Sequence, residues 1–477
     1  MAARAQAAPT GSDVPVTGVT HASTDVRPGD LYAALPGSRT HGANFAAGAA
    51  AAGAVAVLTD PAGADLARES GLPTLVVPDP RAVLGAVADL VYGEPTAGLA
   101  VIGVTGTSGK TTTAYLLEAG LAAAGHTTGL IGTVETRMAG HQVPSALTTP
   151  EAADLHASFA AMREAGVSAV AMEVSSHALT LGRVGGVRFA AVGFTNLSQD
   201  HLDFHDGMEE YFAAKRALFE APYRRAGRVE VVNADDPYGR RLIGPDTVTV
   251  SAAGDASATW WLSDVDAGAG SRFTLHGPGF TGAGAVRLPG AYNLANAGLA
   301  VALLAGVGVD PAVALPALEG VQVPGRMERV DAGQPYLAVV DYAHKPDAVT
   351  AALAALRPLT KGRLIVVLGA GGDRDRGKRP LMGAAAARGA DLVIVTDDNP
   401  RSEDPAAIRA ELLAGIPDGA LEVGDRAAAI AAAVGRAGPG DTVLIAGKGH
   451  EQGQNVAGVV APFDDRTVLR AAIEATR

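Results

Sequence analysis

Residues 101–112 read Val-Ile-Gly-Val-Thr-Gly-Thr-Ser-Gly-Lys-Thr-Thr, and this stretch decides the fold. An apolar run of strand character over 99–104 feeds a tight glycine turn, and a helical pattern over 112–123 follows at once. Such a turn directs backbone N–H groups and the positive end of a helix at one point, which suits a polyphosphate. We expect Lys110 to reach the β- and γ-phosphates and the Thr111 hydroxyl to hold Mg²⁺.

The match to the nucleotide-binding pattern is to its shorter form. The full pattern G-x4-G-K-[ST] requires glycine where this chain has Val104, so the chain fits only G-x2-G-K-T. A glycine turn by itself is also compatible with a purely structural role. The strand before it and the helix after it favour nucleotide binding.

Length and composition limit the classes of protein. With 477 residues, 48% of them hydrophobic, the chain is long enough for about three domains with cores of their own. The absence of cysteine excludes disulfides, thiolate metal sites and a cysteine nucleophile. The net charge of −12 argues against nucleic acid as a partner. No signal pattern or membrane-spanning run is visible, so we expect a cytoplasmic protein with no membrane partner, and a monomer.

Strand and helix patterns alternate along nearly the whole chain, which predicts an α/β fold in three domains. We expect a small α/β domain over 1–98 and a central ATPase-like domain with a mostly parallel sheet over 99–325. A Rossmann-like doubly wound domain is expected over 326–477. Residues 94–98 resemble a linker, and 258–288 a small antiparallel excursion.

Polar residues follow several strands of the central domain. Glu173 comes directly after the apolar run 169–172, where it is placed to join Thr111 on Mg²⁺. The alternative is a helix start capped by Ser175 or Ser176.

A second polar group follows the run 190–194. His201 and His205 are four residues apart, so a helix would place them on one face. Zinc is one candidate ion for this group, although a second Mg²⁺ held through a histidine is favoured beside a nucleotide. Lys215 lies in the amphipathic pattern 211–219, and the pattern alone favours a surface lysine.

Three polar loops follow strands of the third domain, over 369–379, 397–401 and 447–451. The carboxyl ends of parallel strands meet at one crevice, so these loops should converge. Their arginines and carboxylates suit a ligand that carries both an amine and a carboxylate. The alternative is ordinary solvated loop charge.

Taken in order, these residues resemble the Mur ligase family of ATP-dependent amide-forming enzymes. The resemblance is carried by Gly106 to Thr112, Thr148-Thr149-Pro150, Glu173 to His177, Asp200-His201-Leu202-Asp203, Lys215, Asn233-Ala234-Asp235-Asp236, Asn293, Asn296, Pro324-Gly325-Arg326-Met327-Glu328 and Asp341-Tyr342-Ala343-His344. It implies that the three domains hold a UDP moiety, ATP and an incoming amino acid in turn. Asp398-Asn399-Pro400-Arg401 resembles the motif of members that add diaminopimelate rather than lysine, with UDP-N-acetylmuramoyl-L-Ala-D-Glu as the acceptor.

The resemblance also implies roles for single residues. For ATP these are Gly106, Thr107, Ser108, Gly109, Lys110, Thr111, Thr112, Asn293, Asn296, Arg326, Asp341 and His344. For two Mg²⁺ ions they are Thr111 and Glu173, then His201 and Lys215 carried as a carbamate; Lys110, Lys215, His201 and Glu173 are the implied catalytic set. For the UDP substrate they are Ser23, Ser38, Arg39, Thr40, Thr148, Thr149, Ser175 and Arg183. For diaminopimelate they are Arg374, Asp398, Asn399, Pro400, Arg401, Gly447 and Glu451.

The chain departs from the family pattern at a few positions. Ser108 replaces an asparagine of the phosphate loop, Ala22-Ser23-Thr24 replaces an Asp-Ser-Arg, and Lys345 replaces a frequent threonine. None of these changes removes an implied catalytic group. The rival readings are a lysine-adding or folylpolyglutamate-type ligase and a nucleotide-dependent switch without ligase activity. The switch is disfavoured because the chain has no Asn-Lys-x-Asp motif.

Overall fold

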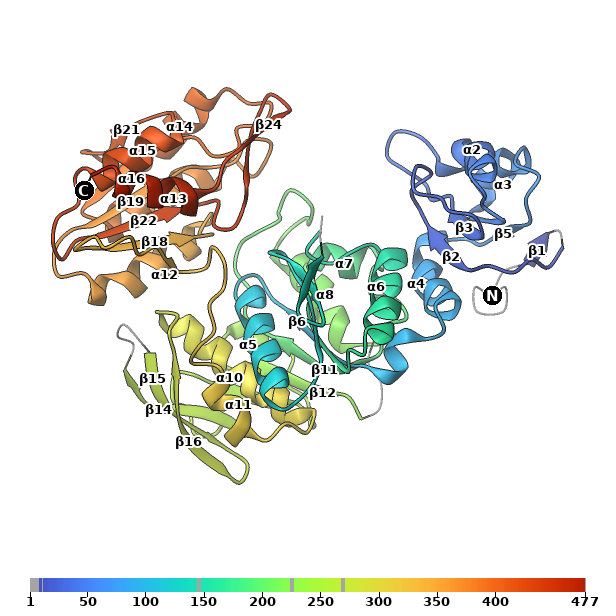
Figure 1. Cartoon of the computed structure of the whole chain (residues 1–477), viewed down its shortest axis with the longest axis horizontal. Coiled ribbons are helices and arrows are strands. Elements are labelled where there is room, and N and C mark those ends of the chain that lie inside the picture. The colour runs from blue at the N-terminus through green and yellow to red at the C-terminus, as the bar shows by residue number, and fades with distance from the viewer. Residues whose placement is uncertain (1–7, 11, 144–146, 224–226, 267–270, 477) are drawn as a thin grey trace. The chain divides into compact units, whose positions relative to one another are not determined.

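The computed structural model describes residues 8–10, 12–143, 147–223, 227–266 and 271–476 (Figure 1). The chain forms two compact units. The first comprises Met1–Gly106, Ala124–Phe194 and Phe212–Glu230, and the second comprises Thr107–Ala123, Thr195–Tyr211 and Val231–Arg477. Both units are α/β, which confirms the predicted class. Each is described by itself below.

The first unit contains a five-stranded sheet with the order β1-β5-β4-β3-β2, in which only β1 is antiparallel to its neighbour. Its strands are β1 (Ala8–Thr10), β2 (Gly18–Thr20), β3 (Asp30–Ala33), β4 (Ala56–Thr59) and β5 (Thr74–Val76). Its helices are η1 (Gly42–Phe45), α2 (Ala46–Ala51), α3 (Pro61–Arg68), α4 (Pro80–Val91) and η2 (Pro95–Gly98). Asp60 and Asp79 cap α3 and α4, and each is followed by proline at the first helical position. The sequence pattern missed α3, and the expected linker is the short helix η2.

Six strands of a second, eleven-stranded sheet belong to this unit, in the order β11-β6-β10-β7-β8-β9. They are β6 (Ala100–Thr105), β7 (Thr128–Ile131), β8 (Thr136–Met138), β9 (His141–Val143), β10 (Ala169–Glu173) and β11 (Phe189–Phe194), with helices α6 (Ala152–Glu164), α7 (Ser176–Thr180) and η3 (Ala217–Phe219). The strands β11, β6, β10 and β7 run parallel, and Glu173 pairs in register with Val104. The end of β10 therefore lies beside the end of β6, where the glycine turn begins.

Two elements pass from one unit into the other along the chain: α8 (Met208–Arg216) and β12 (Val229–Asn233). In the second unit, α5 (Lys110–Ala123) packs against α10 (Ala291–Gly306) and α11 (Pro311–Ala317). The helix α9 (Pro237–Arg240) and strand β13 (Val248–Ser251) precede β14 (Trp260–Asp266), β15 (Ser271–Gly277) and β16 (Phe280–Val286). The last three pair antiparallel, which confirms the expected excursion.

The second unit also holds a six-stranded sheet with the order β17-β18-β22-β19-β20-β21, parallel except for β17. The strands are β17 (Glu328–Arg329), β18 (Leu337–Asp341), β19 (Leu364–Leu368), β20 (Leu392–Val395), β21 (Leu421–Glu422) and β22 (Thr442–Ala446). The helices are α12 (Pro346–Leu356), η4 (Arg357–Leu359), α13 (Lys378–Gly389), α14 (Pro405–Leu413), α15 (Arg426–Val434) and α16 (Asp465–Glu474). This is the predicted doubly wound arrangement. The sequence pattern did not indicate the hairpin of β23 (Gly453–Val456) and β24 (Val459–Pro462).

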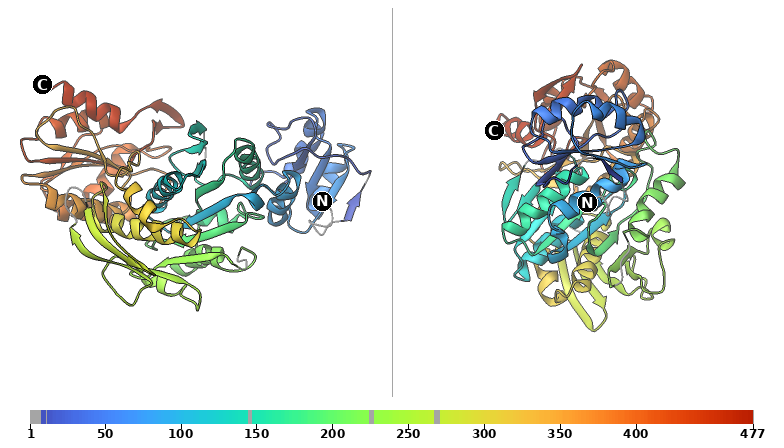
Figure 2. Two further views of the ribbon diagram at one scale, coloured as in Figure 1. Left: turned by 60° about the horizontal axis from the view of Figure 1, so that its bottom comes forward. Right: turned by 90° about the vertical axis from the view of Figure 1, so that its right-hand side faces the viewer.

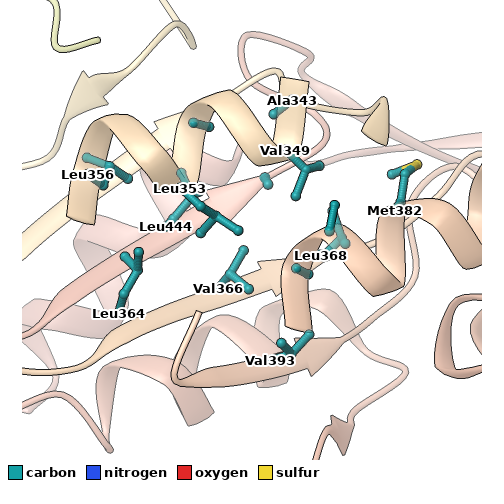
Figure 3. Packing of buried hydrophobic residues seen from close by; sticks show 14 of the residues in the cluster. Ala343, Val349, Leu353, Leu356, Leu364, Val366, Leu368, Met382, Val393 and Leu444 are labelled. Carbon is teal, nitrogen blue, oxygen red and sulfur yellow. The ribbon is translucent and has the colours of Figure 1, made fainter. Parts of the chain in front are cut away.

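Alternate side chains of β19 point to opposite faces of that sheet. Val366 and Leu368 pack with Leu353 of α12 and Met382 of α13 (Figure 3). Ile365 and Val367 pack in a second cluster with residues of α15 and α16. The left view of Figure 2 shows the orange and red strands between helices on both sides. Both faces are covered, so the strand is apolar at every position, as parallel strands in such folds are.

Within the described part of the chain, no helix has both the length and the apolar character that crossing a membrane requires.

Candidate active site

The glycine turn after β6 adopts a conformation that needs glycine. Gly109 has φ +88°, in the left-handed region, and a Cβ there would lie 2.4 Å from Oδ1 of Asn296. The Lys110 ammonium donates to the carbonyl of Thr107 at 3.0 Å, so it lies over the turn. The turn thus leads into the N-terminus of α5 as the sequence predicts.

A neighbouring segment that follows β11 fixes the turn. The backbone N–H of Thr107 donates to the carbonyl of Asn196 at 2.8 Å, and that of Ser108 donates to the Asn196 amide oxygen at 3.0 Å. The Thr195 hydroxyl donates to the Ser108 carbonyl at 2.7 Å. These bonds use the main chain at 108, which explains why serine is accommodated where the family has asparagine.

A cavity of about 270 Å³ in the second unit lies beside this segment and the start of α10. Its lining mixes polar and apolar surface and comprises Thr195, Asn196, Asn233, Asp235, Asp236, Pro237, Tyr292, Ala295, Asn296 and Leu299. Asn296 was predicted to lie on the nucleotide side, and it lines this cavity. Asn293 does not line it: its side chain donates to the Pro289 carbonyl and accepts from Asn296, so it supports its neighbour.

Of the ten residues in this lining, the predicted set of nucleotide-side residues contained only Asn296; Asn233, Asp236 and Tyr292 are among the nine that it omitted. The sequence did carry a signal for the first two, because Asn233-Ala234-Asp235-Asp236 directly follows an apolar strand. Asp236 also accepts from the backbone N–H of Leu197 at 3.2 Å, which ties the cavity wall to the segment that holds the phosphate turn.

Arg326, Asp341 and His344 cluster around the end of β18. An Nη of Arg326 lies 3.3 Å from the Thr111 hydroxyl, and the guanidinium stacks 4.2 Å above the ring of Tyr342. The carboxylate of Asp341 accepts from the backbone N–H groups of Met327 and Ala343, and its burial raises its pKa. Asp341 therefore shapes the turn that presents Arg326.

His344 is held in one tautomer. Its Nδ1 donates to the Tyr342 carbonyl at 2.7 Å. Burial, with Lys345 and Lys378 adding positive charge nearby, lowers the pKa of His344 well below its usual value. The ring is therefore neutral at physiological pH and keeps its lone pair on Nε2.

The segment that carries His201 differs from the prediction. No helix joins His201 to His205: α8 begins only at Met208, and a turn places the His205 side chain fully in the interior while that of His201 is 44% exposed. The expectation that both lie on one helical face is wrong, because the glycine at 207 and a left-handed residue at 201 break the pattern. Among the described residues, no group of three or more His, Asp or Glu side chains is arranged to hold a metal ion, so zinc gains no support.

Asp200 sits between two nitrogens. Its Oδ2 lies 2.6 Å from the ammonium of Lys345 and 3.0 Å from Nε2 of His201. Burial alone would raise the pKa of Asp200, but Lys345 and His201 hold it well below the usual range. Lys345, which replaces a threonine of the family pattern, thus has a buried ionic partner that the sequence did not reveal.

In the first unit, Glu173 and Lys215 are both almost fully buried, at 1% exposure. The Glu173 carboxylate accepts from the backbone N–H and the hydroxyl of Thr133, at 2.8 and 3.1 Å. The Lys215 ammonium donates to the carbonyl of Gly106, the first residue of the phosphate turn, at 2.8 Å. The pattern-based expectation of a surface lysine is therefore wrong, because the helix turns this residue inward. Ser175 is the cap of α7, which leaves the Glu173 carboxylate uninvolved in capping.

The residues expected around the peptide part of the UDP substrate form one hydrogen-bonded group. Thr149 donates to the Glu173 carbonyl and accepts from the Ser175 N–H, at 2.9 and 3.1 Å. Thr148 lies 3.0 Å from the Thr133 hydroxyl. Arg183 donates to the Thr149 carbonyl at 3.3 Å and pairs with Glu151 at 2.8 Å.

The expected uridine-side residues lie in the N-terminal part of the first unit. The side chain of Ser23 lies near the Tyr32 hydroxyl, which donates to the Gly42 carbonyl at 2.9 Å. Ser38, Arg39 and Thr40 are exposed in a loop that a bridge between Pro36 and His41 closes.

The three loops of the C-terminal sheet converge as predicted. The Asn399 amide donates to Glu451 at 2.7 Å, and Arg401 donates to the Gly372 carbonyl at 2.6 Å. Gly447 has φ +120°, and a Cβ there would lie 2.5 Å from an oxygen of Asp398. Pro400 lies so close to the backbone of Gly372 that only glycine fits opposite it.

Two features of these loops lie outside the prediction. Lys448 is fully buried and pairs with Asp398 at 3.1 Å, so Asp398 is partly committed to a neighbour within the protein. Arg374 is 55% exposed, with an Nη 3.8 Å from Asp203. Burial and Asp398 raise the pKa of Glu451.

The fold and the glycine turn together define an α/β protein of the phosphate-loop class. Comparison with known proteins identifies the family within that class. Three protein-family models match in succession: the Mur ligase family catalytic domain over 15–92, the Mur ligase middle domain over 104–304 and the Mur ligase glutamate ligase domain over 325–449.

Named relatives agree with these matches. The chain is 58% identical to the UDP-N-acetylmuramoyl-L-alanyl-D-glutamate–2,6-diaminopimelate ligase of Streptomyces avermitilis, over 98% of this chain and 94% of that protein. It is 55% identical to the ligase of the same name from Corynebacterium glutamicum, over 93% and 89%. A solved structure of a ligase of that name is 33% identical, covers 97% of this chain and 95% of its own, and gives a TM-score of 0.68. The chain belongs to the Mur ligase family.

Proposed function

We propose that this chain is an ATP-dependent ligase that joins diaminopimelate to the D-glutamate carboxyl group of UDP-N-acetylmuramoyl-L-Ala-D-Glu, a step of peptidoglycan precursor synthesis. The observation that carries the proposal is the end-to-end identity of 58% with a relative of that name. The packed Asp398–Arg401 loop supports the choice of amine over the lysine-adding alternative, because Arg401 is a suitable partner for the extra carboxylate of diaminopimelate.

The reaction proceeds in two steps. A substrate carboxylate oxygen attacks the γ-phosphorus of ATP, which gives an acyl phosphate and ADP. The diaminopimelate amine then attacks the acyl carbon, and the amide forms as phosphate leaves. Phosphoryl transfer depends mainly on positioning and on neutralising the charge of the transferred oxygens, and Lys110 supplies a fixed positive charge for this.

We assign the substrates to three domains, with UDP-sugar binding over 1–98, ATP binding over 99–325 and amino-acid binding over 326–477. The cavity lined by Asn296, Asp236 and Tyr292 offers both polar groups and apolar surface, which suits the nucleoside part of ATP. Gly106 to Thr112 would hold the phosphates, and Arg326 beside Thr111 adds charge at the same turn. Asp341 and His344, at the turn next to Arg326, complete the proposed set of ATP-side residues.

The donor set fits Mg²⁺, which prefers hard oxygen ligands. Thr111 and Glu173 would hold one ion, and His201 with a carbamate on Lys215 would hold the second. The position of Lys215, buried beside the carbonyl of Gly106, supports this, because a carbamate there would be an anionic oxygen ligand next to the phosphate turn. When bound, the ions would neutralise charge on the phosphate oxygens.

Thr148, Thr149, Ser175 and Arg183 are the proposed contacts of the peptide part, and their hydrogen-bonded grouping supports a common role. Ser23, Ser38, Arg39 and Thr40 are the proposed UDP-side contacts. For diaminopimelate the proposed residues are Arg374, Asp398, Asn399, Pro400, Arg401, Gly447 and Glu451. We further propose that the enzyme acts in the cytoplasm as a monomer.

Phosphate release from ATP in the presence of UDP-N-acetylmuramoyl-L-Ala-D-Glu tests the proposal, with diaminopimelate and L-lysine supplied separately. Turnover with diaminopimelate, and a product heavier by one residue in mass spectrometry, is the expected result. Turnover with lysine alone would keep the ligase but reject the assignment of the Asp398–Arg401 loop. Failure with both amines would reject the proposed reaction.

A further inference from the structure

The loop from Asp398 to Arg401 contains two non-glycine residues with left-handed backbone. Asn399 has φ +42° and Arg401 has φ +52°. This conformation is unfavourable for an L-residue, although asparagine tolerates it better than most. Two such residues within three positions persist only where surrounding contacts hold them.

The contacts that hold them come from the hairpin β23–β24. The backbone N–H of Asn399 donates to the side-chain oxygen of Gln454 at 3.1 Å, and the N–H of Asn455 donates back to the Asn399 side-chain oxygen at 2.9 Å. Around Arg401, its N–H donates to the Asn455 carbonyl at 3.0 Å, and its carbonyl accepts from Ala457 at 2.6 Å. The hairpin therefore brackets both left-handed residues.

The hairpin is in turn fixed to the rest of the site. The ammonium of Lys448 donates to the Gly453 carbonyl at 2.8 Å and pairs with Asp398. The loop, the hairpin and the buried Lys448 thus form a closed set of contacts. Within the hairpin, Gln454 binds the loop through its side chain whereas Asn455 and Ala457 bind it through their main chain, so Gln454 can be changed without touching the backbone ladder.

We propose that Gln454 is a positioning residue for the amine-donor site: by holding Asn399 it sets where Arg401 presents its guanidinium. The inference rests on the proposed function and deepens it. Diaminopimelate differs from lysine by one additional carboxylate, which an arginine fork can recognise only from a fixed position. A loosened loop would therefore weaken binding of diaminopimelate and reduce its advantage over lysine.

The test compares Gln454→Met, which keeps the length and removes the acceptor, with Gln454→Glu, which keeps an acceptor oxygen. Val459→Thr, on the opposite strand of the hairpin at 71% exposure, is the matched control. For each variant we would measure KM for diaminopimelate, KM for ATP, the melting temperature, and amide hydrogen exchange of residues 397–403.

We expect Gln454→Met to raise KM for diaminopimelate about tenfold, the effect of one lost hydrogen bond, with KM for ATP unchanged. Gln454→Glu and Val459→Thr should stay within about threefold of the unchanged protein. Amide exchange of residues 397–403 should accelerate in Gln454→Met alone.

An unchanged KM for diaminopimelate in Gln454→Met, an equal rise in both KM values, or equal behaviour of the Met and Glu variants would overturn the inference. The exchange measurement keeps it separate from the proposed function. If the unchanged protein turns over with neither amine, the proposed function fails. Amide hydrogen exchange then decides whether Gln454 holds the loop, and unaltered exchange of residues 397–403 in Gln454→Met would reject that role.

Discussion

The phosphate turn and the Asp398–Arg401 loop both follow a parallel strand, yet they reach left-handed backbone by different means. The phosphate turn reaches left-handed backbone at a glycine, with φ +88° at Gly109, so no side chain is strained there. The second loop uses Asn399 and Arg401, which carry side chains, and depends on a hairpin about 55 positions away for its shape. Left-handed backbone at a glycine is set by the residue itself, because glycine has no side chain to strain. Left-handed backbone at other residues has to be stabilised by tertiary contacts.

The two loops also differ in the charge of what supports them. The neutral side chains of Thr195 and Asn196 hold the phosphate turn at Ser108, and the ammonium of Lys215 donates to the carbonyl of Gly106 at its start. The second loop and its surroundings rely on charged pairs such as Lys448 with Asp398. The first loop should therefore respond to changes of its own glycines and of Lys110, and the second to changes elsewhere and to pH.

The largest effect should come from Lys110→Ala. Loss of the fixed charge on the transferred phosphate should lower kcat by roughly a thousandfold, the scale of removing one group that stabilises developing charge. Phosphate release from ATP measures it. Lys361→Ala, an exposed lysine of the C-terminal sheet domain, serves as the matched control and should be silent. Activity near that of the unchanged protein in Lys110→Ala would remove this residue from the reaction.

Arg401→Ala should act on the second loop with the next largest effect. Loss of a charge-assisted contact to a carboxylate should raise KM for diaminopimelate about thirtyfold, while KM for ATP stays constant. Steady-state kinetics with each substrate varied in turn separates the two constants. Arg388→Ala, exposed on α13, is the control. A constant KM for diaminopimelate would place Arg401 outside the amine site.

The difference between the two loops explains which structural features could be predicted from the sequence. The strand before Gly106, the glycine spacing and Lys110 are adjacent in the chain, so the pattern determined the turn and its neighbours. The polar residues after β10 and after the strands of the C-terminal sheet were found for a related reason. Parallel topology sends every strand end to one edge, so an apolar run followed by Glu173 or Asp398 already indicates a position.

What escaped prediction depends on partners distant in sequence. Lys215 has a surface-like pattern, but its ammonium reaches a carbonyl 109 positions away. The pairing of Lys345 with Asp200 has the same character. The hairpin strand Gly453–Val456 is short and has no alternation of apolar and polar residues, so nothing in it indicates a strand. Local patterns do not contain the contacts that bury these groups.

Gly109→Ala and Asn399→Gly test the difference between the two loops directly. Gly109→Ala puts a side chain where the first loop uses glycine, and Asn399→Gly puts glycine where the second loop uses a side chain. A Cβ at Gly109 adds backbone strain and meets Asn296, so we expect a loss of about 2 kcal/mol in stability or a matching weakening of ATP binding. Asn399→Gly leaves the backbone unstrained but removes both side-chain bonds, so KM for diaminopimelate should rise about tenfold with ATP unaffected. Thermal unfolding and the two KM values measure both. Equal tolerance of the two changes would contradict the distinction between local and tertiary control.

The smallest effect concerns the charged surroundings of the second loop. Glu403 accepts from the Arg379 guanidinium at 2.8 Å and from the Asp373 N–H at 2.6 Å, and Asp373 in turn binds Ser402 beside the loop. These bonds, Arg379 first, lower the pKa of Glu403 to about 2.

A carboxyl group whose pKa is lower in the folded state stabilises the fold at pH values above its unfolded pKa, about 4.3, and loses that contribution as the pH falls toward 2. Because the side chain is partly exposed, its contribution should be only about 1 kcal/mol after screening. Denaturant unfolding of the unchanged protein and of Glu403→Gln should therefore differ by a constant amount between pH 5 and 7, and the difference should shrink below about pH 4. A difference that persists undiminished down to pH 2 would mean that Glu403 acts through packing, and the dependence of the second loop on charged pairs would lose this support.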